Sequence, residues 1–134
     1  MLENMVKLAS EKNERIHYLG FQPQNEIWKY LSRAKAMLFP TDLYEGFPMT
    51  LIESFSMGTP VICSDIGNGA DIVKSADAGV AYERRNKEAL SKAINDIDEH
   101  FAQYSLNARN AYETQFTPEA NYKQLKSIYE AISK

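Results

Sequence analysis

Two glutamates, Glu45 and Glu53, stand eight positions apart in the chain, on either side of Pro48. Proline favours the first position of a helix, because its missing N–H would have no partner there. The sequence therefore predicts a loop that carries Glu45 and a helix over residues 48–57 that carries Glu53. Eight residues of helix rise about 12 Å, whereas paired glycosidase carboxylates lie about 5–9.5 Å apart. We interpret the two carboxylates as acceptors for hydroxyls spaced along an extended ligand, with two solvated charges as the alternative.

The start of this predicted helix has the properties of an anion site. The backbone amides of Met49, Thr50 and Leu51 belong to its first turn, where amides have no intrahelical partner. Gly46 lets a ligand approach the backbone closely. Because an apolar run, residues 36–40, ends just before this loop, we expect the helix to begin at the carboxyl end of a parallel strand. Such a position binds phosphate groups.

Short apolar runs alternate with longer amphipathic segments along the chain. The runs that predict strands are residues 16–20, 36–40, 61–63 and 79–82. They are nearly continuously apolar, as expected for strands buried on both faces of a parallel sheet. The segments that predict helices are residues 1–13, 25–34, 48–57, 71–75, 86–97, 101–114 and 118–133. Asn86 and Thr117 are predicted N-caps. This alternation indicates an α/β domain with a mostly parallel, Rossmann-like sheet flanked by helices.

Composition excludes several classes of protein. The chain has 134 residues, 44% hydrophobic and 25% charged, with a net charge of −3, which is typical of one soluble globular domain. The acidic balance argues against a nucleic-acid partner. The single cysteine, Cys63, cannot form an internal disulfide, and no apolar run is long enough to span a bilayer. We expect a single domain over residues 1–134, in the cytoplasm, with a buried thiol at Cys63.

The residues around the two glutamates resemble a known signature. Glu45 and Glu53 with their seven-residue spacer, followed by Gly58-Thr59-Pro60-Val61, are similar to the motif of the retaining glycosyltransferases called group 1, or family 4. Flanking segments that also fit are Leu19-Gly20-Phe21, Gly67-Asn68-Gly69-Ala70-Asp71 and Ala78-Gly79-Val80. The resemblance covers about residues 15–97 and implies the GT-B fold, in which two Rossmann-like domains flank a cleft. This chain resembles the C-terminal, donor-binding domain, truncated at its N-terminus.

The resemblance implies a role for each matching residue. Glu45 is the implied catalytic residue and contacts the hydroxyls of the donor sugar, while Glu53 holds the ribose hydroxyls. The other implied donor contacts are made by Gly46, Phe47, Met49, Thr50 and Leu51. Phe21 and Gln22 are implied to lie near the nucleobase, and the segment 67–69 near the donor sugar. No cofactor or metal is implied, because positive charge and the helix dipole neutralise the diphosphate.

The chain also departs from the family pattern. Pro48 stands where glycine or serine is common, and Asp71 stands where glutamate is usual. Nothing before Arg15 matches the opening strands that carry the Arg and Lys gripping the diphosphate. In the family's strand order these missing strands lie between the 16–20 strand and the 36–40 strand. We therefore expect the isolated chain to transfer no sugar.

The resemblance implies transfer of a hexosyl group from a nucleotide diphosphate-sugar to an acceptor, in surface polysaccharide or glycolipid synthesis. Two alternatives stay open: a non-catalytic nucleotide-sugar-binding subunit of a two-chain transferase, and an epimerase with the GT-B fold. Expected partners are the nucleotide-sugar donor and an acceptor domain or subunit outside this chain, with peripheral membrane contact through the full-length protein.

Trp28 and the tyrosines of the last helices are interpreted as packing residues. An apolar stripe predicted on the last helix favours self-association; it comprises Tyr122, Leu125, Ile128, Tyr129 and Ile132.

Overall fold

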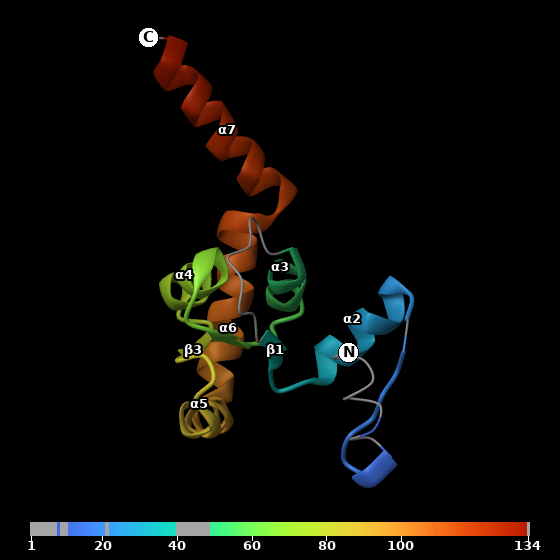
Figure 1. Ribbon diagram of the computed structural model, residues 1–134. Coiled ribbons are helices and arrows are strands. Elements are labelled where there is room, and N and C mark those ends of the chain that lie inside the picture. The colour runs from blue at the N-terminus through green and yellow to red at the C-terminus, as the bar shows by residue number, and fades with distance from the viewer. Residues whose placement is uncertain (1–7, 9–10, 21, 40–48, 134) are drawn as a thin grey trace.

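The computed structural model describes residues 8, 11–20, 22–39 and 49–133, and the elements below belong to this part of the chain (Figure 1). From residue 24 onward, seven helices and three strands follow one another in the order α2 (Gln24–Arg33), β1 (Met37–Phe39), α3 (Met49–Ser56), β2 (Val61–Ser64), α4 (Gly67–Ala76), β3 (Gly79–Tyr82), α5 (Lys87–Glu99), α6 (Phe101–Ala111), the π-helix η1 (Tyr112–Phe116) and α7 (Pro118–Ser133). The predicted alternation of strands and helices is thus confirmed from residue 24 onward. Of the predicted helix over residues 1–13, the structure describes only residues 8 and 11–13, and residues 8, 11 and 12 are helical as predicted.

The three strands form one parallel sheet in the order β1-β2-β3. In the register of the sheet, Met37 of β1 pairs with Val61 of β2, and Val61 pairs with Gly79 of β3. All three strands therefore end at the same edge of the sheet. β2 lies in the middle and all four of its residues are buried, as its apolar run predicts. The elements that follow each strand start from this carboxyl edge, where ligands of open α/β sheets bind.

One face of the sheet is closed by α3, α4 and α6, on the side opposite α5 (Figure 1). Phe55 and Leu51 of α3 are completely buried there, as is Val73 of α4. They pack with Val61 and Cys63 of β2. The side chains of α3 reach the sheet because its apolar residues Leu51, Ile52 and Phe55 recur at helical spacing. We call this side the closed face.

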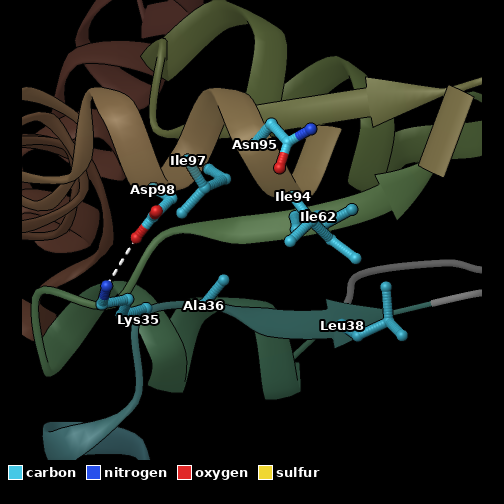
Figure 2. Close-up of a pocket in the computed structure, with 8 residues that line it drawn as sticks. All are labelled: Lys35, Ala36, Leu38, Ile62, Ile94, Asn95, Ile97 and Asp98. Atoms are coloured by element: carbon cyan, nitrogen blue, oxygen red, sulfur yellow. Dashed lines mark hydrogen bonds and ion pairs between the residues drawn. The ribbon is translucent and has the colours of Figure 1, made fainter. Parts of the chain in front are cut away.

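The opposite side, which we call the open face, is covered by α5. Ile62 and Tyr82 from the sheet pack with Ala93 and Ile97 of α5. Between α5 and β1 a groove of about 300 Å³ remains, shown in Figure 2. Leu38 of β1 is 49% exposed in this groove. The ion pair between Lys35 Nζ and Asp98 Oδ1, 2.5 Å apart, bridges the groove at one end.

The predicted strand over residues 16–20 is wrong: this segment has no regular secondary structure. A strand needs a neighbour to satisfy its backbone N–H and C=O groups, and the described sheet contains only β1, β2 and β3. Ile16 is 39% exposed and Leu19 is 44% exposed, so they do not enter the core.

Two helices differ in extent from their predictions. The predicted helix over residues 71–75 is longer in the structure, because α4 begins at Gly67 and is ten residues long. Gly67 begins α4 with a φ of +75°, a left-handed backbone conformation that glycine adopts readily because it has no Cβ atom. The predicted helix over residues 101–114 ends as α-helix at Ala111 and continues as the π-helix η1.

The two predicted N-caps are confirmed. The Asn86 side chain accepts a hydrogen bond from the Ala89 amide at 2.9 Å, and Thr117 Oγ1 accepts one from the Ala120 amide at 3.1 Å. Beyond Thr117, α7 projects away from the sheet (Figure 1). Tyr122 on α7 is 66% exposed, so the packing role expected for it is not seen in this structure. Self-association through this helix stays a prediction.

Candidate functional site

α3 is the next described element after β1, in the order that the motif predicts. β1 ends at Phe39 and α3 begins at Met49. The predicted loop contacts Glu45, Gly46 and Phe47 lie outside the described residues, so their placement stays a prediction.

A second helix begins beside the start of α3. α4 starts at Gly67, three residues after the end of β2. A Cβ atom built on Gly69 would lie 3.6 Å from Leu51 Cδ1 and 3.7 Å from Phe39 Cε1. The first turns of α3 and α4 therefore meet at the end of β1. Each helix N-terminus carries a partial positive charge, and together they make this edge favourable for an anion.

The three predicted donor residues of the first turn of α3 differ in exposure. Met49 is 60% exposed and Thr50 is also exposed, so both residues are accessible at the start of α3. The Leu51 side chain is completely buried in the closed face. Because Leu51 as a whole has no exposed surface, this structure does not offer it to a ligand, and the donor contact expected at Leu51 stays a prediction.

Glu53 lies one turn further along α3 and is partly buried. Its Oε2 atom accepts a hydrogen bond of 2.8 Å from the side-chain amide Nε2 of Gln24, the first residue of α2. A second contact joins the same two segments further on, because Thr59 Oγ1 donates to the Leu31 carbonyl at 2.5 Å in a buried position. These two contacts connect α2 to α3 and to the segment that follows α3.

Glu53 also lines a groove of about 510 Å³ between α2, α3 and the segment around η1. The residues that line it are Trp28, Met49, Ile52, Glu53, Ser56, Met57, Arg109, Tyr112, Phe116 and Pro118. Arg109 donates a hydrogen bond to the Ser56 carbonyl, at the end of α3. The groove thus combines one carboxylate with aromatic and methionine side chains.

The expected role of Trp28 is only partly correct. Its side chain is 41% exposed and faces the groove instead of being enclosed by the core. The indole therefore offers a ring surface within the groove that contains Glu53. No sequence pattern distinguishes such a position, because the periodicity of α2 places Trp28 next to its apolar stripe.

Of the two residues expected near a nucleobase, only Gln22 is described. Its Nε2 donates to the Leu19 carbonyl at 2.6 Å, which fixes the turn before α2. Phe21 lies outside the described residues. The predicted contact of this segment with a base stays a prediction.

Cys63 is buried, as expected, and is not a candidate nucleophile. Its burial, together with the nearby negative charge of Asp65, raises the pKa of the thiol from 9.0 to about 11. The thiolate is the reactive form, so a raised pKa makes the group inert at neutral pH.

Within the described residues no three His, Cys, Asp or Glu side chains are grouped to hold a metal ion. No helix in that part of the chain is long and apolar enough to cross a membrane.

Sequence reasoning missed Gln24. Its contact with Glu53 joins positions 29 residues apart on two helices, and no local spacing signals such a pair. The sequence feature that comes closest to indicating Gln24 is Pro23, which marks the start of α2. Side chains in the first turn of a helix can reach a neighbouring element.

Comparison with known proteins supports the resemblance. The family Glycosyl transferases group 1 matches residues 2–114. The amylovoran biosynthesis glycosyltransferase AmsK of Erwinia amylovora is 28% identical over 98% of this chain and 35% of its own length. The D-rhamnosyltransferase WbpZ of Pseudomonas aeruginosa is 30% identical over 82% of this chain and 28% of its own length.

Among solved structures, the sucrose-phosphate synthase of Thermosynechococcus elongatus superposes with a TM-score of 0.77 at 26% identity, covering 98% of this chain and 33% of that protein. The parallel sheet flanked by helices is thus the expected Rossmann-like fold of a GT-B protein. The chain spans about a third of the length of these relatives. With most of its residues matched by the family, the chain belongs to the group 1 glycosyltransferases.

Proposed function

We propose that this chain is the donor-binding part of a retaining glycosyltransferase that takes a sugar from a nucleotide diphosphate-sugar. The observation that carries the proposal is the placement of Glu53 one turn inside α3, whose first turn meets that of α4 at the carboxyl edge of the sheet. A diphosphate is favoured at the two helix N-termini. A ribose bound next to it comes within reach of the Glu53 carboxylate.

The groove beside Glu53 supports the same assignment. It runs from Met49, at the start of α3, past Glu53 to Met57, after its end. Eight residues of helix span about 12 Å, a length suited to a nucleoside diphosphate. Glu45 is assigned to the sugar hydroxyls, and as catalytic residue, from the resemblance alone.

Polysaccharide synthesis is the proposed setting, because AmsK is named for amylovoran biosynthesis and other relatives for O-antigen chains and teichuronic acid. The acceptor, and the domain or subunit that binds it, are proposed to lie outside these 134 residues. We accordingly expect the isolated chain to bind donor nucleotide and to transfer no sugar. Robust turnover by the purified chain alone would contradict this part of the proposal.

Titration with UDP and GDP tests the donor site. Trp28 is the only tryptophan of the chain and lines the groove with Glu53, so its fluorescence reports binding directly. Glu53→Gln should weaken the tighter of the two nucleotides by about ten-fold or more, since hydrogen bonds to a charged group contribute about 1.5–3 kcal/mol. Removing a negative charge would by itself strengthen binding of an anion, so a weaker affinity cannot arise from net charge.

Glu99→Gln is the matched control, because it makes the same charge change at the exposed end of α5. We expect it to leave the affinity unchanged. Absence of binding by both nucleotides, or an affinity that Glu53→Gln does not lower, would refute the assignment of Glu53.

A further inference from the structure

We infer that Gln24 is a positioning residue for Glu53: it holds the carboxylate in the orientation that accepts the ribose hydroxyls. This inference rests on the proposed function. Its basis is the 2.8 Å hydrogen bond from Gln24 Nε2 to Glu53 Oε2, which joins α2 to α3.

The bond restricts a side chain that is otherwise flexible. Glutamate has three rotatable side-chain bonds, and ordering them opposes binding. Gln24 engages one carboxylate oxygen, and a carboxylate accepts about four hydrogen bonds in all. Glu53 can therefore still accept hydrogen bonds from two vicinal hydroxyls. The rotational freedom of its carboxylate is already reduced before a ligand binds.

The position of Gln24 is itself determined by the fold. Gln24 is the first residue of α2, directly after the N-cap Pro23. The other end of α2 is fixed to the segment after α3 by the buried bond from Thr59 Oγ1 to the Leu31 carbonyl. Because α2 is held at Leu31 as well as at Gln24, the Gln24 side chain is kept within reach of Glu53.

The chemistry of the amide also matters. A lysine or arginine at this position would orient the carboxylate but neutralise its charge, which weakens its hydrogen bonds to hydroxyls. The glutamine amide donates without carrying a charge. Glu53 therefore remains a full anion and the stronger acceptor.

Gln24→Leu tests the inference without changing charge or helix propensity appreciably. Three probes are titrated against the 134-residue chain: the nucleoside diphosphate that binds more tightly, its 2′,3′-dideoxy analogue, and inorganic pyrophosphate. We expect Gln24→Leu to weaken the nucleotide roughly three- to ten-fold, as for one hydrogen bond, and to leave both probes that lack the diol unchanged. In a Glu53→Gln background the same substitution should have no effect.

Gln103→Leu is the control, since this exposed glutamine on α6 also donates a side-chain hydrogen bond, to Asn107 Oδ1 at 2.9 Å. It should alter neither affinity nor melting temperature. Equal weakening of all three probes by Gln24→Leu would show a merely structural role and overturn the inference. Loss of folding in both Gln24→Leu and Gln24→Ala would overturn it for the same reason.

Two further outcomes separate this inference from the proposed function. If the wild-type chain prefers the nucleotide over its dideoxy analogue and Gln24→Leu keeps that preference, Gln24 is not a positioning residue and the donor site stands. If the wild-type chain shows no preference, Glu53 does not bind the ribose, and both the donor-site assignment and this inference fail.

Discussion

The two faces of the sheet are covered to different extents, although the same three strands supply both. On the closed face, Phe55 and Leu51 from α3 have no exposed surface, and neither has Val73 from α4. On the open face, Leu38 and Ile94 are each about half exposed, at 49% and 51%. Alternate residues of one strand thus meet different surroundings: Met37 and Phe39 pack against the closed core, while Leu38 between them lines a groove.

This difference locates the rigid part of the candidate site. The site elements α3 and α4 both belong to the closed face, so the first turns that meet at the end of β1 rest on fully packed side chains. A binding geometry is most precise where its supporting side chains are held by packing. The contrast therefore indicates that the anion-binding edge depends on the closed face and tolerates change in the open one.

The largest contrast should appear when a large side chain is truncated on each face. Phe55→Ala should lower the free energy of unfolding by about 3–5 kcal/mol, because it removes a completely buried ring and leaves a cavity. Leu38→Ala should cost less than about 1 kcal/mol, because half of that side chain is already in water. Urea unfolding of both variants measures the two values. Equal losses would show that the open face is covered in solution.

Raising the pH should lower the free energy of unfolding through one group near each face, and the two groups should act over different pH ranges. The pKa of Cys63 on the closed face is raised by burial from 9.0 to about 11. The pKa of Tyr104 beside the open-face cluster is raised by burial, and by its hydrogen bond to Asp96, from 10.0 to about 12. Folding favours the neutral form of each group. The resulting stabilisation of the fold is therefore complete at a pH below the ordinary pKa of the group, and it is lost as the pH rises through the raised pKa of the folded state.

Unfolding measured at a series of pH values separates the two groups. Cys63→Ala should flatten the stability profile between pH 9 and 11, where the thiol accounts for up to about 2–3 kcal/mol. Tyr104→Phe should flatten it between pH 10 and 12. A profile that neither substitution changes would contradict these pKa shifts.

The connection of α2 to the closed side can be broken at Thr59. Thr59→Val keeps the shape of the side chain but removes the donor to the Leu31 carbonyl. The expected loss is about 1–3 kcal/mol, because a buried carbonyl then lacks its partner. Ser32→Ala, which removes an exposed bond to the Lys29 carbonyl, should cost less than about 0.5 kcal/mol. Thermal melts compare the two, and similar losses would contradict the importance of the buried bond.

The smallest effect is expected at the rim of the open-face groove. Lys35→Ala removes the ion pair with Asp98, whose side chains are 70% and 62% exposed. Exposed pairs contribute less than about 1 kcal/mol and are screened by salt. Chemical unfolding at low and high salt should therefore show a small loss that disappears at high salt. A larger, salt-independent loss would mean that the pair is shielded from solvent.

Much of the fold could be predicted from local patterns. Asn86 and Thr117 mark helix starts because a side-chain oxygen within three residues satisfies a free amide. The apolar runs over residues 61–63 and 79–82 identify β2 and β3, since strands covered on both faces favour apolar side chains. The position of Glu53 within a helix that follows a strand was likewise readable from Pro48 and the apolar spacing after it.

The segment 16–20 shows where such reasoning stops. Its apolar run has the composition of a strand, but a strand exists only where another strand offers hydrogen bonds. No residue in the segment carries that information, because the partner of a strand is set by the assembled sheet. The same limit applies to α4, which begins at Gly67 rather than at Asp71: packing against the closed face compensates for the low helix propensity of Gly69.

For this protein the sequence by itself determined the order of the elements and the motif that places it among the group 1 glycosyltransferases. It did so because caps, apolar spacing and the two glutamates depend on residues close together in the chain. Only the tertiary structure decided which face of the sheet is closed, that the first turns of α3 and α4 meet, and that Gln24 contacts Glu53. These features depend on contacts between distant residues, and their geometry exists only once the helices have packed on the sheet.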